Sequence, residues 1–180
     1  HLAQVLPALA SWRRREQDRS ATEGWRYLVT WVPVPVSDPG PTALSGTWLL
    51  MVPNGLADSD LARGAARALA GAGAHVMVTE VPAGPERPVL AVRIAEALAE
   101  AQEAQASGIV SLLGLDEGDV PGYPTVPVGL AATLVLVQAL GDAGAGAPLW
   151  VLTQGAVTAG PGEVLANPVQ AGVWGLGRVV

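Results

Sequence analysis

The sequence predicts an α/β fold: a parallel β-sheet with helices on both faces, preceded by a short N-terminal helix. Short apolar segments typical of buried strands alternate along the chain with longer segments in which apolar residues recur at helical spacing. This alternation is typical of βαβ units, whose strands run parallel. With 180 residues, 50% of them hydrophobic, the chain is also long enough to bury a core of its own.

The composition excludes several kinds of function. The formal net charge of −6 argues against nucleic-acid binding, and the lack of cysteine excludes disulfides and thiolate metal sites. All ten basic residues are arginines, so chemistry that needs a lysine is excluded within this sequence. No signal peptide is visible, and the longest apolar run, residues 128–137, is too short to span a bilayer. We therefore expect a soluble cytoplasmic protein with neither nucleic-acid nor membrane partners.

Residues 1–22 predict a short amphipathic helix, separate from a larger domain in residues 23–180. Apolar residues recur at helical spacing, and an arginine-rich end follows them. Two interpretations stay open for this helix. It packs on its own domain, or it is a linker or dimer-contact helix with the candidate contact residues Leu6, Leu9 and Trp12. A nucleic-acid patch on the arginines is a third interpretation, which the acidic charge of the chain disfavours.

The larger domain is predicted to open with an aromatic strand. In residues 25–32 large apolar side chains alternate with others, so that Trp25, Tyr27 and Trp31 fall on one face. The proline-rich segment after it, residues 33–41, is incompatible with a central strand. We expect the aromatic strand at an edge of the sheet or against a neighbouring domain.

Residues 48–81 predict one βαβ unit of the Rossmann type. The predicted strands are residues 48–52 and 75–81, and a helix around residues 61–69 connects them. Glu80 stands at the end of the second strand, where a ribose-binding acid would be expected in a nucleotide-binding unit.

The turn after the first strand of this unit lacks the glycines of a nucleotide-binding loop. It contains one glycine, Gly55, and no G-x-G-x-x-G pattern that would let the backbone approach a pyrophosphate. Asp58, the predicted N-cap, and Asp60 would place carboxylates at the positive end of the helix dipole, where they repel a phosphate. We therefore predict no cofactor-binding residues at this turn and interpret Glu80 as an ordinary strand-end acid.

The remaining segments continue the alternation of helices and strands. Helices are expected around residues 90–98 and 125–140, and strands at residues 108–113 and 149–152. The second of these helices is apolar on nearly every face, so we expect it to be buried between its neighbours.

The last helix is the segment that most affects the interpretation of the chain. Asn167 is its predicted N-cap and Pro168 its predicted first residue. Apolar residues then recur at helical spacing up to Val180, with no polar end. We therefore expect the chain to continue beyond this residue as part of a larger protein.

The sequence predicts neither catalytic nor metal-binding residues. Asp116, Glu117 and Asp119 follow the third buried strand, where a hard-cation site is one interpretation and a solvated acidic loop is the one we favour. A Ser-His-Asp triad needs a well-placed histidine, but His1 is terminal and His75 begins a predicted buried strand. A short-chain dehydrogenase needs a tyrosine four residues before a lysine on a helix, and the last helix has neither.

Three segments resemble ketoreductase domains of modular type I polyketide synthases. They are Trp-Arg-Tyr-Leu-Val-Thr-Trp at 25–31, Pro-Leu-Trp-Val-Leu-Thr-Gln-Gly-Ala-Val at 148–157, and Asn-Pro-Val-Gln-Ala-Gly-Val-Trp-Gly-Leu-Gly-Arg at 167–178. The resemblance covers residues 24–180. Residues 6–15 look like the end of the linker or dimerization element that precedes such domains.

The resemblance implies that the chain is the N-terminal, non-catalytic half of such a ketoreductase, a truncated short-chain-dehydrogenase-like Rossmann subdomain. Its implied partner is a catalytic half that follows it and reduces a β-ketoacyl group on an acyl carrier protein with NADPH. No catalytic residue of that family has a counterpart here. A homodimer through the N-terminal helix is also implied.

The implied contacts with the catalytic half are apolar side chains that have no evident packing role within the domain: Trp25, Tyr27, Trp31, Trp174 and Leu176. An ordinary core role is the alternative for each of them. Two other functions stay open for the whole chain: a free-standing inactive interaction scaffold, and a true nucleotide-binding domain with an atypical loop.

Overall fold

The computed structural model describes most of the chain, namely residues 2–23, 30–35, 43–100, 106–160 and 162–180. The chain divides into two compact units.

The first unit, His1–Pro35, contains the helix α1 (Leu2–Glu23) and an irregular segment. The predicted N-terminal helix is therefore confirmed. The predicted aromatic strand is wrong in its described part, because residues 30–35 have no regular secondary structure. Two prolines in this segment lack the N–H that a neighbouring strand would bond. Trp25 and Tyr27 lie outside the described residues.

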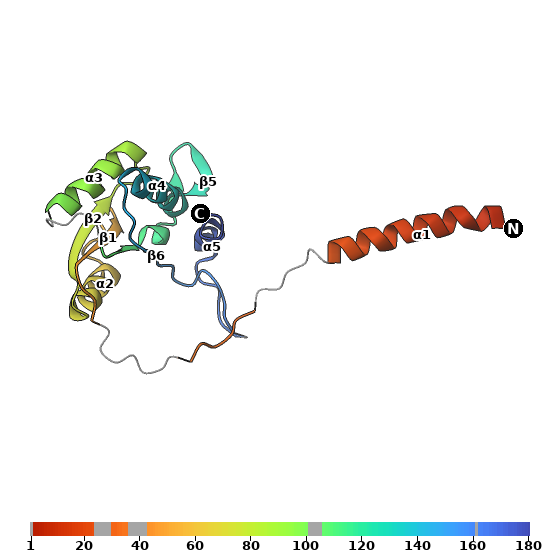
Figure 1. Cartoon of the computed structure of the whole chain (residues 1–180), viewed down its shortest axis with the longest axis horizontal. Helices are drawn as coiled ribbons and strands as arrows, with labels where there is room; N and C mark the ends of the chain where they lie inside the picture. Colours follow the sequence, from red (N-terminus) through yellow and green to blue (C-terminus); the bar gives the residue numbers. More distant parts are fainter. Residues whose placement is uncertain (1, 24–29, 36–42, 101–105, 161) are drawn as a thin grey trace. The chain divides into compact units, whose positions relative to one another are not determined.

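The second unit, Val36–Val180, is built on a four-stranded parallel sheet with the strand order β2-β1-β3-β6 (Figure 1). All four predicted strands of this sheet are confirmed. Because β2 lies at an edge, His75 is exposed rather than buried as predicted. The strands are β1 (Thr47–Pro53), β2 (His75–Val81), β3 (Gly108–Ser111) and β6 (Leu149–Val151).

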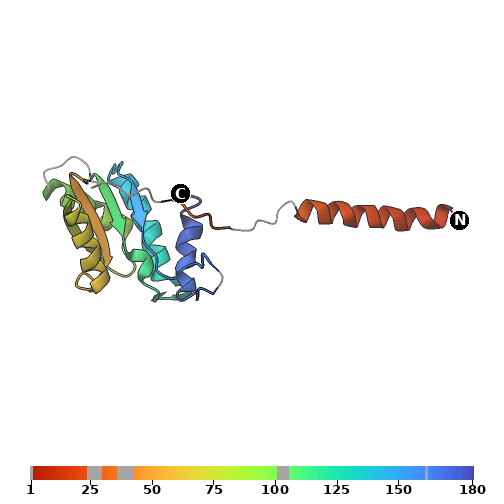
Figure 2. The same ribbon diagram turned by 90° about the horizontal axis from the view of Figure 1, so that it is seen from below.

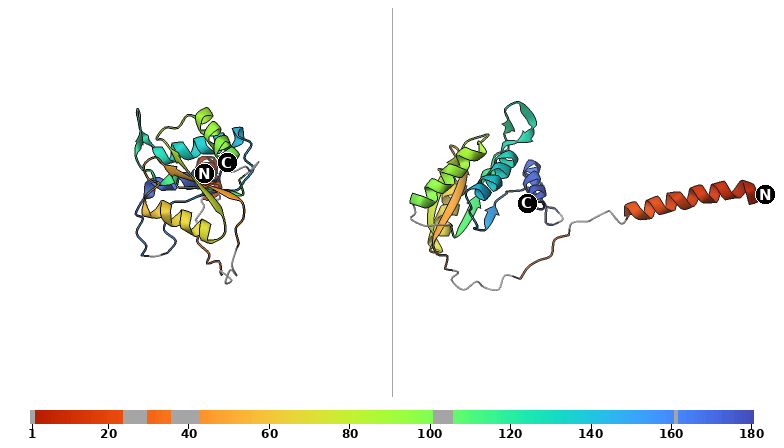
Figure 3. Two further views of the ribbon diagram at one scale, coloured as in Figure 1. Left: turned by 90° about the vertical axis from the view of Figure 1, so that its left-hand side faces the viewer. Right: turned by 45° about the horizontal axis from the view of Figure 1, so that its top comes forward.

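Helices cover both faces of the sheet, as predicted. Figure 3 (left) shows α2 (Asp60–Gly71) on one face, and α3 (Arg87–Glu100) and α4 (Val128–Asp142) on the other. A short helix, α5 (Ala171–Leu176), packs beside α4 at the β6 end of the sheet (Figure 2). Within the described part of the chain, no helix combines the length and the apolar character that crossing a membrane requires.

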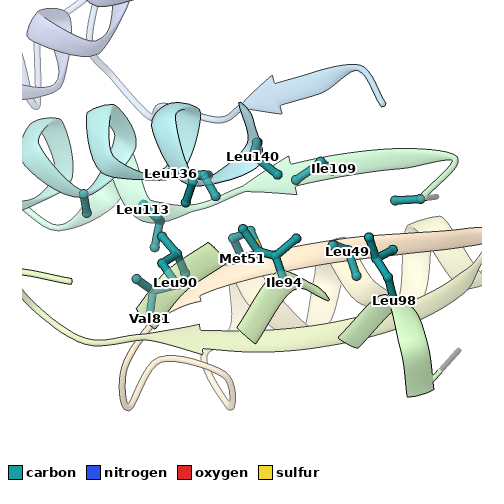
Figure 4. Packing of buried hydrophobic residues seen from close by; sticks show 13 residues of the cluster. Leu49, Met51, Val81, Leu90, Ile94, Leu98, Ile109, Leu113, Leu136 and Leu140 are labelled. Atoms are coloured by element: carbon teal, nitrogen blue, oxygen red, sulfur yellow. The ribbon is translucent and has the colours of Figure 1, made fainter. Parts of the chain in front are cut away.

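The core lies on both sides of β1, which explains why its sequence is continuously apolar. Leu49 and Met51 point toward α3 and α4 and join the cluster shown in Figure 4. Leu50 and Val52 point to the opposite face, into a second cluster with α2. All four side chains are fully buried. Buried on both faces, β1 has no polar side, which is typical of a central parallel strand.

A hairpin missed by the sequence analysis precedes α4. The short strand β4 (Asp119–Val120) pairs antiparallel with β5 (Tyr123–Pro127), and the hairpin extends from the body of the unit (Figure 3, right). The helix therefore begins at Val128 and not at residue 125 as predicted. Pro127 is its N-cap, a position just outside the helix.

Helix α4 is buried between its neighbours, as expected, except along one side. Leu136 and Ala139 have no exposed surface, whereas Leu134 is 41% exposed and Val137 is partly exposed. The sheet, α3 and α5 cover the rest of the helix, but the described residues leave this apolar stripe uncovered.

The N-cap of α2 is Ser59 and not the predicted Asp58. The Ser59 Oγ accepts a hydrogen bond from the Ala62 N–H at 3.2 Å, which satisfies one of the free donors at the start of the helix. Asp60 is the first helical residue and pairs with Arg63 at 2.8 Å.

Gly129 should tolerate no side chain. A Cβ there would lie 2.5 Å from the Leu113 carbonyl oxygen and 2.7 Å from that of Asp116, both backbone atoms that cannot rotate away. We predict that Gly129→Ala lowers the free energy of unfolding by about 1–3 kcal/mol, as overpacked core substitutions do. Gly141→Ala in the same helix is the control, because its Cβ would meet open space and should raise stability by up to about 1 kcal/mol. Urea unfolding measures both, and equal effects would contradict the prediction.

An ion pair between Arg87 and Asp142 links α3 to α4, with two hydrogen bonds from the guanidinium to the carboxylate. These bonds lower the pKa of Asp142; burial opposes the shift and the positive charge of Arg87 adds to it. A carboxyl whose pKa is lowered by folding stabilises the fold above its unfolded pKa, and this stability is lost as the pH falls through the folded pKa.

We predict that Asp142→Asn lowers stability at pH 7 and that its difference from wild type disappears at acid pH, below the folded pKa of Asp142. Urea unfolding across this range, with Arg87→Gln and the double variant, gives the coupling between the two side chains. A coupling that persists unchanged at acid pH would show that the pair acts through packing and not through charge.

Candidate functional site

The turn between β1 and α2 occupies the place of a nucleotide-binding loop, and three of its backbone N–H groups donate to carbonyl oxygens within the chain. The Asn54 N–H donates to the Val81 carbonyl at 2.9 Å, and the Leu56 N–H to the Pro53 carbonyl at 3.0 Å. The Ser59 N–H donates to the Leu56 carbonyl at 3.1 Å. These groups are therefore not directed at an outside anion.

A fourth backbone donor, at the tip of the turn, is bound by Glu80. Gly55 has a φ of +80°, a conformation that favours glycine, and its N–H donates to the Glu80 Oε1 at 2.9 Å. Arg93 fixes the same residue from the other side by donating to the Glu80 carbonyl oxygen at 3.0 Å. A carboxylate of the chain itself thus accepts a backbone N–H of the kind that a nucleotide-binding turn offers to a phosphate.

The residues at this turn do not fit a dinucleotide. Glu80 brings a negative charge to the backbone donor, and Asp60 adds a second carboxylate at the start of α2. Both would repel a pyrophosphate, and neither a second nor a third glycine allows the backbone to approach one. The interpretation of Glu80 as an ordinary strand-end acid is incomplete, because its side chain closes the turn.

The acidic loop after β3 is tied to the start of α5 by Gln170, which is 5% exposed. The Gln170 Nε2 donates to the Glu117 Oε1 at 2.9 Å, and its Oε1 accepts from the Gln154 N–H at 2.8 Å. Asp116 accepts from the Gly118 N–H at 3.0 Å. Among the residues that the structure describes, no three His, Cys, Asp or Glu side chains gather where they could hold a metal ion.

The last helix differs from the prediction at its start. A short 3₁₀ turn, η2 (Pro168–Gln170), comes first, and α5 begins only at Ala171. Asn167 forms no side-chain cap and instead donates its Nδ2 to the Gln154 carbonyl at 2.8 Å. This bond fixes the loop before α5 to the chain just beyond β6.

The region where a catalytic helix would meet the end of a strand carries no group for proton transfer. Trp174 on α5 donates its indole N–H to the Thr153 Oγ1, just after β6, at 2.9 Å. An indole N–H does not act as an acid or base near neutral pH, and no lysine is present to assist it. The contact holds α5 against the end of β6.

An open apolar groove of about 730 Å³ runs beside β6. Its walls are side chains of α4, β6, α5 and the residues after α5. The polar side chains on the walls are two threonines and one arginine. The lining residues are Thr133, Val137, Leu149, Val151, Thr153, Val173, Trp174, Leu176, Gly177, Arg178 and Val180.

The structure separates the candidate interface residues that the sequence grouped. Trp174 and Leu176 both line the groove, and Trp174 is 40% exposed. Trp31 lies in the other unit and is 42% exposed, and its position relative to the groove is not determined. Trp25 and Tyr27 lie outside the described residues. The sequence analysis missed Gln170 and the lining strand residues, because an isolated Gln and a short apolar strand carry no distinctive pattern.

The candidate contact residues of α1 share one exposed stripe. Leu6 is 58% exposed, Leu9 is 54% exposed and Trp12 is 60% exposed. Large apolar side chains at this spacing form a surface typical of helix pairing.

Comparison with known proteins places these features in a family. The family model for the polyketide synthase extender module SpnB, Rossmann fold domain, matches residues 29–180. The chain is 47% identical over 176 residues to polyketide synthase GfsA of Streptomyces halstedii. It is 43% identical over 183 residues to the pikromycin polyketide synthase component PikAII of Streptomyces venezuelae. Both matches cover 97% of this chain but only 2% and 5% of those proteins.

The fold is also similar to a solved ketoreductase. The structure of a C2-type ketoreductase from a modular polyketide synthase superposes with a TM-score of 0.77 at 44% sequence identity. The match covers 86% of this chain and 32% of the ketoreductase chain. The chain therefore spans about a third of the solved ketoreductase.

Glu80 should stabilise the turn through its bond to Gly55. We predict that Glu80→Ala lowers the free energy of unfolding by about 1 kcal/mol, because the Gly55 N–H loses its acceptor. Glu80→Gln keeps an acceptor oxygen and should lose less. Glu96→Ala, on the exposed face of α3, is the matched control and should change little. Chemical unfolding measures all three; equal stability of Glu80→Ala and the control would refute the role of Glu80.

Proposed function

Because the chain belongs to the Rossmann-fold domain family of polyketide synthase extender modules, we propose that it is the structural half of a ketoreductase. In this role it binds no cofactor and supports a separate catalytic half. That half reduces a β-ketoacyl group on an acyl carrier protein to the β-hydroxyacyl group with NADPH. The observation that carries the proposal is the bond from the Gly55 N–H to the Glu80 carboxylate, which brings a negative charge to the turn where a Rossmann fold would bind the phosphates of a cofactor.

The contact with the catalytic half uses the groove beside β6. Trp174 and Leu176, two members of the candidate interface set, line it. Trp25, Tyr27 and Trp31, at the start of the proposed subdomain in residues 23–180, are further contact residues that we propose for the catalytic half. Burying such side chains removes apolar surface from water, which stabilises both halves.

Residues 1–22 act as a linker or dimerization element. Leu6, Leu9 and Trp12 are exposed on α1, and a second copy of the helix is a partner of matching chemistry. The parent synthase works in the cytoplasm, where its acyl carrier protein presents the substrate.

A free-standing inactive scaffold is the second candidate function. Two of the same observations support it: Glu80 binds the backbone of the β1–α2 turn, and α5 carries Trp174 but neither the tyrosine nor the lysine of a reductase. It differs from the ketoreductase half in needing no catalytic partner.

The test compares three polypeptides: the complete ketoreductase, the same protein without residues 1–180, and residues 1–180 alone. We expect NADPH-dependent reduction of a β-ketoacyl thioester by the complete protein, loss of activity without residues 1–180, and no NADPH binding by residues 1–180. Leu176→Glu should lower the activity and thermal stability of the complete ketoreductase. Val164→Glu is the matched control, because Val164 is 84% exposed and outside the groove. Full activity without residues 1–180 would favour the scaffold, and NADPH binding by residues 1–180 would overturn both functions.

A further inference from the structure

The outer edge of β2 carries backbone groups with which no described strand pairs. In the order β2-β1-β3-β6, only the inner side of β2 faces a neighbouring strand. The His75 N–H donates to the Gly46 carbonyl at 3.0 Å and therefore points inward, toward β1. Because backbone groups alternate in direction along a strand, those of Val76, Val78 and Glu80 point outward. Such outward groups are a template for pairing with a further strand.

The composition of β2 favours such pairing. Its seven residues, His-Val-Met-Val-Thr-Glu-Val, are rich in the β-branched side chains typical of strands. The strand contains neither lysine nor proline, two residues that protect sheet edges. Val78, at the centre of the strand, is 48% exposed, which leaves apolar surface beside the outward groups. An edge of this kind needs protection from outside the strand.

Arg93 on α3 provides this protection. Its Nη1 donates to the Glu80 carbonyl oxygen at 3.0 Å, and this carbonyl is one of the outward groups of β2. The guanidinium therefore lies in front of the edge, where the backbone of an added strand would run. The Glu80 side chain is fixed as well, by the bond from the Gly55 N–H at 2.9 Å.

The outward edge of β2 is complementary to itself. In an antiparallel pair centred on Val78, this residue lies opposite its own copy, and Val76 lies opposite Glu80 of the second copy. Every outward N–H and C=O group of the three residues is then bonded. The two Glu80 carboxylates lie at opposite ends of this pair, whereas a register centred on Glu80 would place like charges opposite each other.

We propose that the β2 edge is a self-pairing surface and that Arg93 keeps it closed. While the guanidinium holds the Glu80 carbonyl, the Val76 N–H of a second copy has no access to this acceptor. Without the guanidinium, two copies pair antiparallel through β2 and join their sheets. This inference goes beyond the proposed function and does not depend on it.

Disulfide crosslinking tests the proposal, because a chain without cysteine reports one contact through one introduced thiol. In the proposed pair the two Val78 Cα atoms lie about 5.5 Å apart, within the range that a disulfide bridges. We expect Val78→Cys with Arg93→Ala to form the linked dimer about tenfold faster than Val78→Cys alone, since a competing hydrogen bond from a charged donor is removed.

The control for random collisions is Val164→Cys, because Val164 is 84% exposed and lies outside the sheet. Its crosslinking rate should be the same with and without Arg93→Ala. Equal crosslinking rates of Val78→Cys with and without Arg93→Ala would overturn the proposal.

Sedimentation equilibrium of the chain without introduced cysteine is the second test. Arg93→Ala should associate more strongly than wild type, and adding Val78→Lys should reverse this, because the pair then places two lysines opposite each other. Arg67→Ala is the matched control: Arg67 donates to the Arg63 carbonyl within α2, so its loss opens no sheet edge. Any association through α1 is common to all these variants. Association of Arg93→Ala that Val78→Lys leaves unchanged would reveal unfolding and overturn the proposal.

Discussion

Burial of β1 on both faces is the constraint on which the rest of this domain depends. A parallel strand with no polar side needs helices above and below it, and α2 on one face and α3 with α4 on the other supply them. The two edge strands of the described sheet, β2 and β6, differ from each other. The β2 edge is a strand of seven residues, whereas the β6 edge is a strand of three residues that opens into an apolar groove. On the proposed function, the β6 edge is where the catalytic half contacts this domain.

At the turn between β1 and α2, a carboxylate of the same chain accepts a backbone N–H of the kind that a nucleotide-binding loop offers to a phosphate. In a loop that binds a nucleotide, backbone N–H groups donate hydrogen bonds to the phosphate of the ligand. Here Glu80 offers the same kind of acceptor, a negatively charged oxygen, from within the chain. An acceptor fixed nearby is always present, so an external phosphate would have to displace it and also overcome its charge. The turn keeps its shape without a ligand, which suits a domain whose contribution is structural.

The sequence predicted the elements better than it predicted the contacts between them. The apolar run of β1, the βαβ spacing and the missing glycines were readable because each is a local pattern. The bond between Gly55 and Glu80 was not, because it joins residues 25 positions apart and depends on the register that pairs Val52 with Glu80. The hairpin before α4 was missed because Pro127 was interpreted as a residue of the first helical turn. Proline is equally compatible with the N-cap position just before the helix, which it occupies here. Gln170, an isolated amide, became informative only when the fold placed it between Glu117 and Gln154.

The polar side chain of Gln170 connects the acidic loop after β3 to the chain just after β6. Gln170 and Asn167 both bind the backbone of Gln154, just after β6, and Trp174 binds Thr153 beside it. These bonds fix α5 relative to β6, so the two walls of the groove are held apart before any partner arrives. A groove fixed in this way spares its partner the entropic cost of ordering the walls, which strengthens association without adding a contact. On the proposed function, the bonds from Gln170, Asn167 and Trp174 therefore serve the interface, because they hold α5 against the end of β6 where the catalytic half would contact the groove.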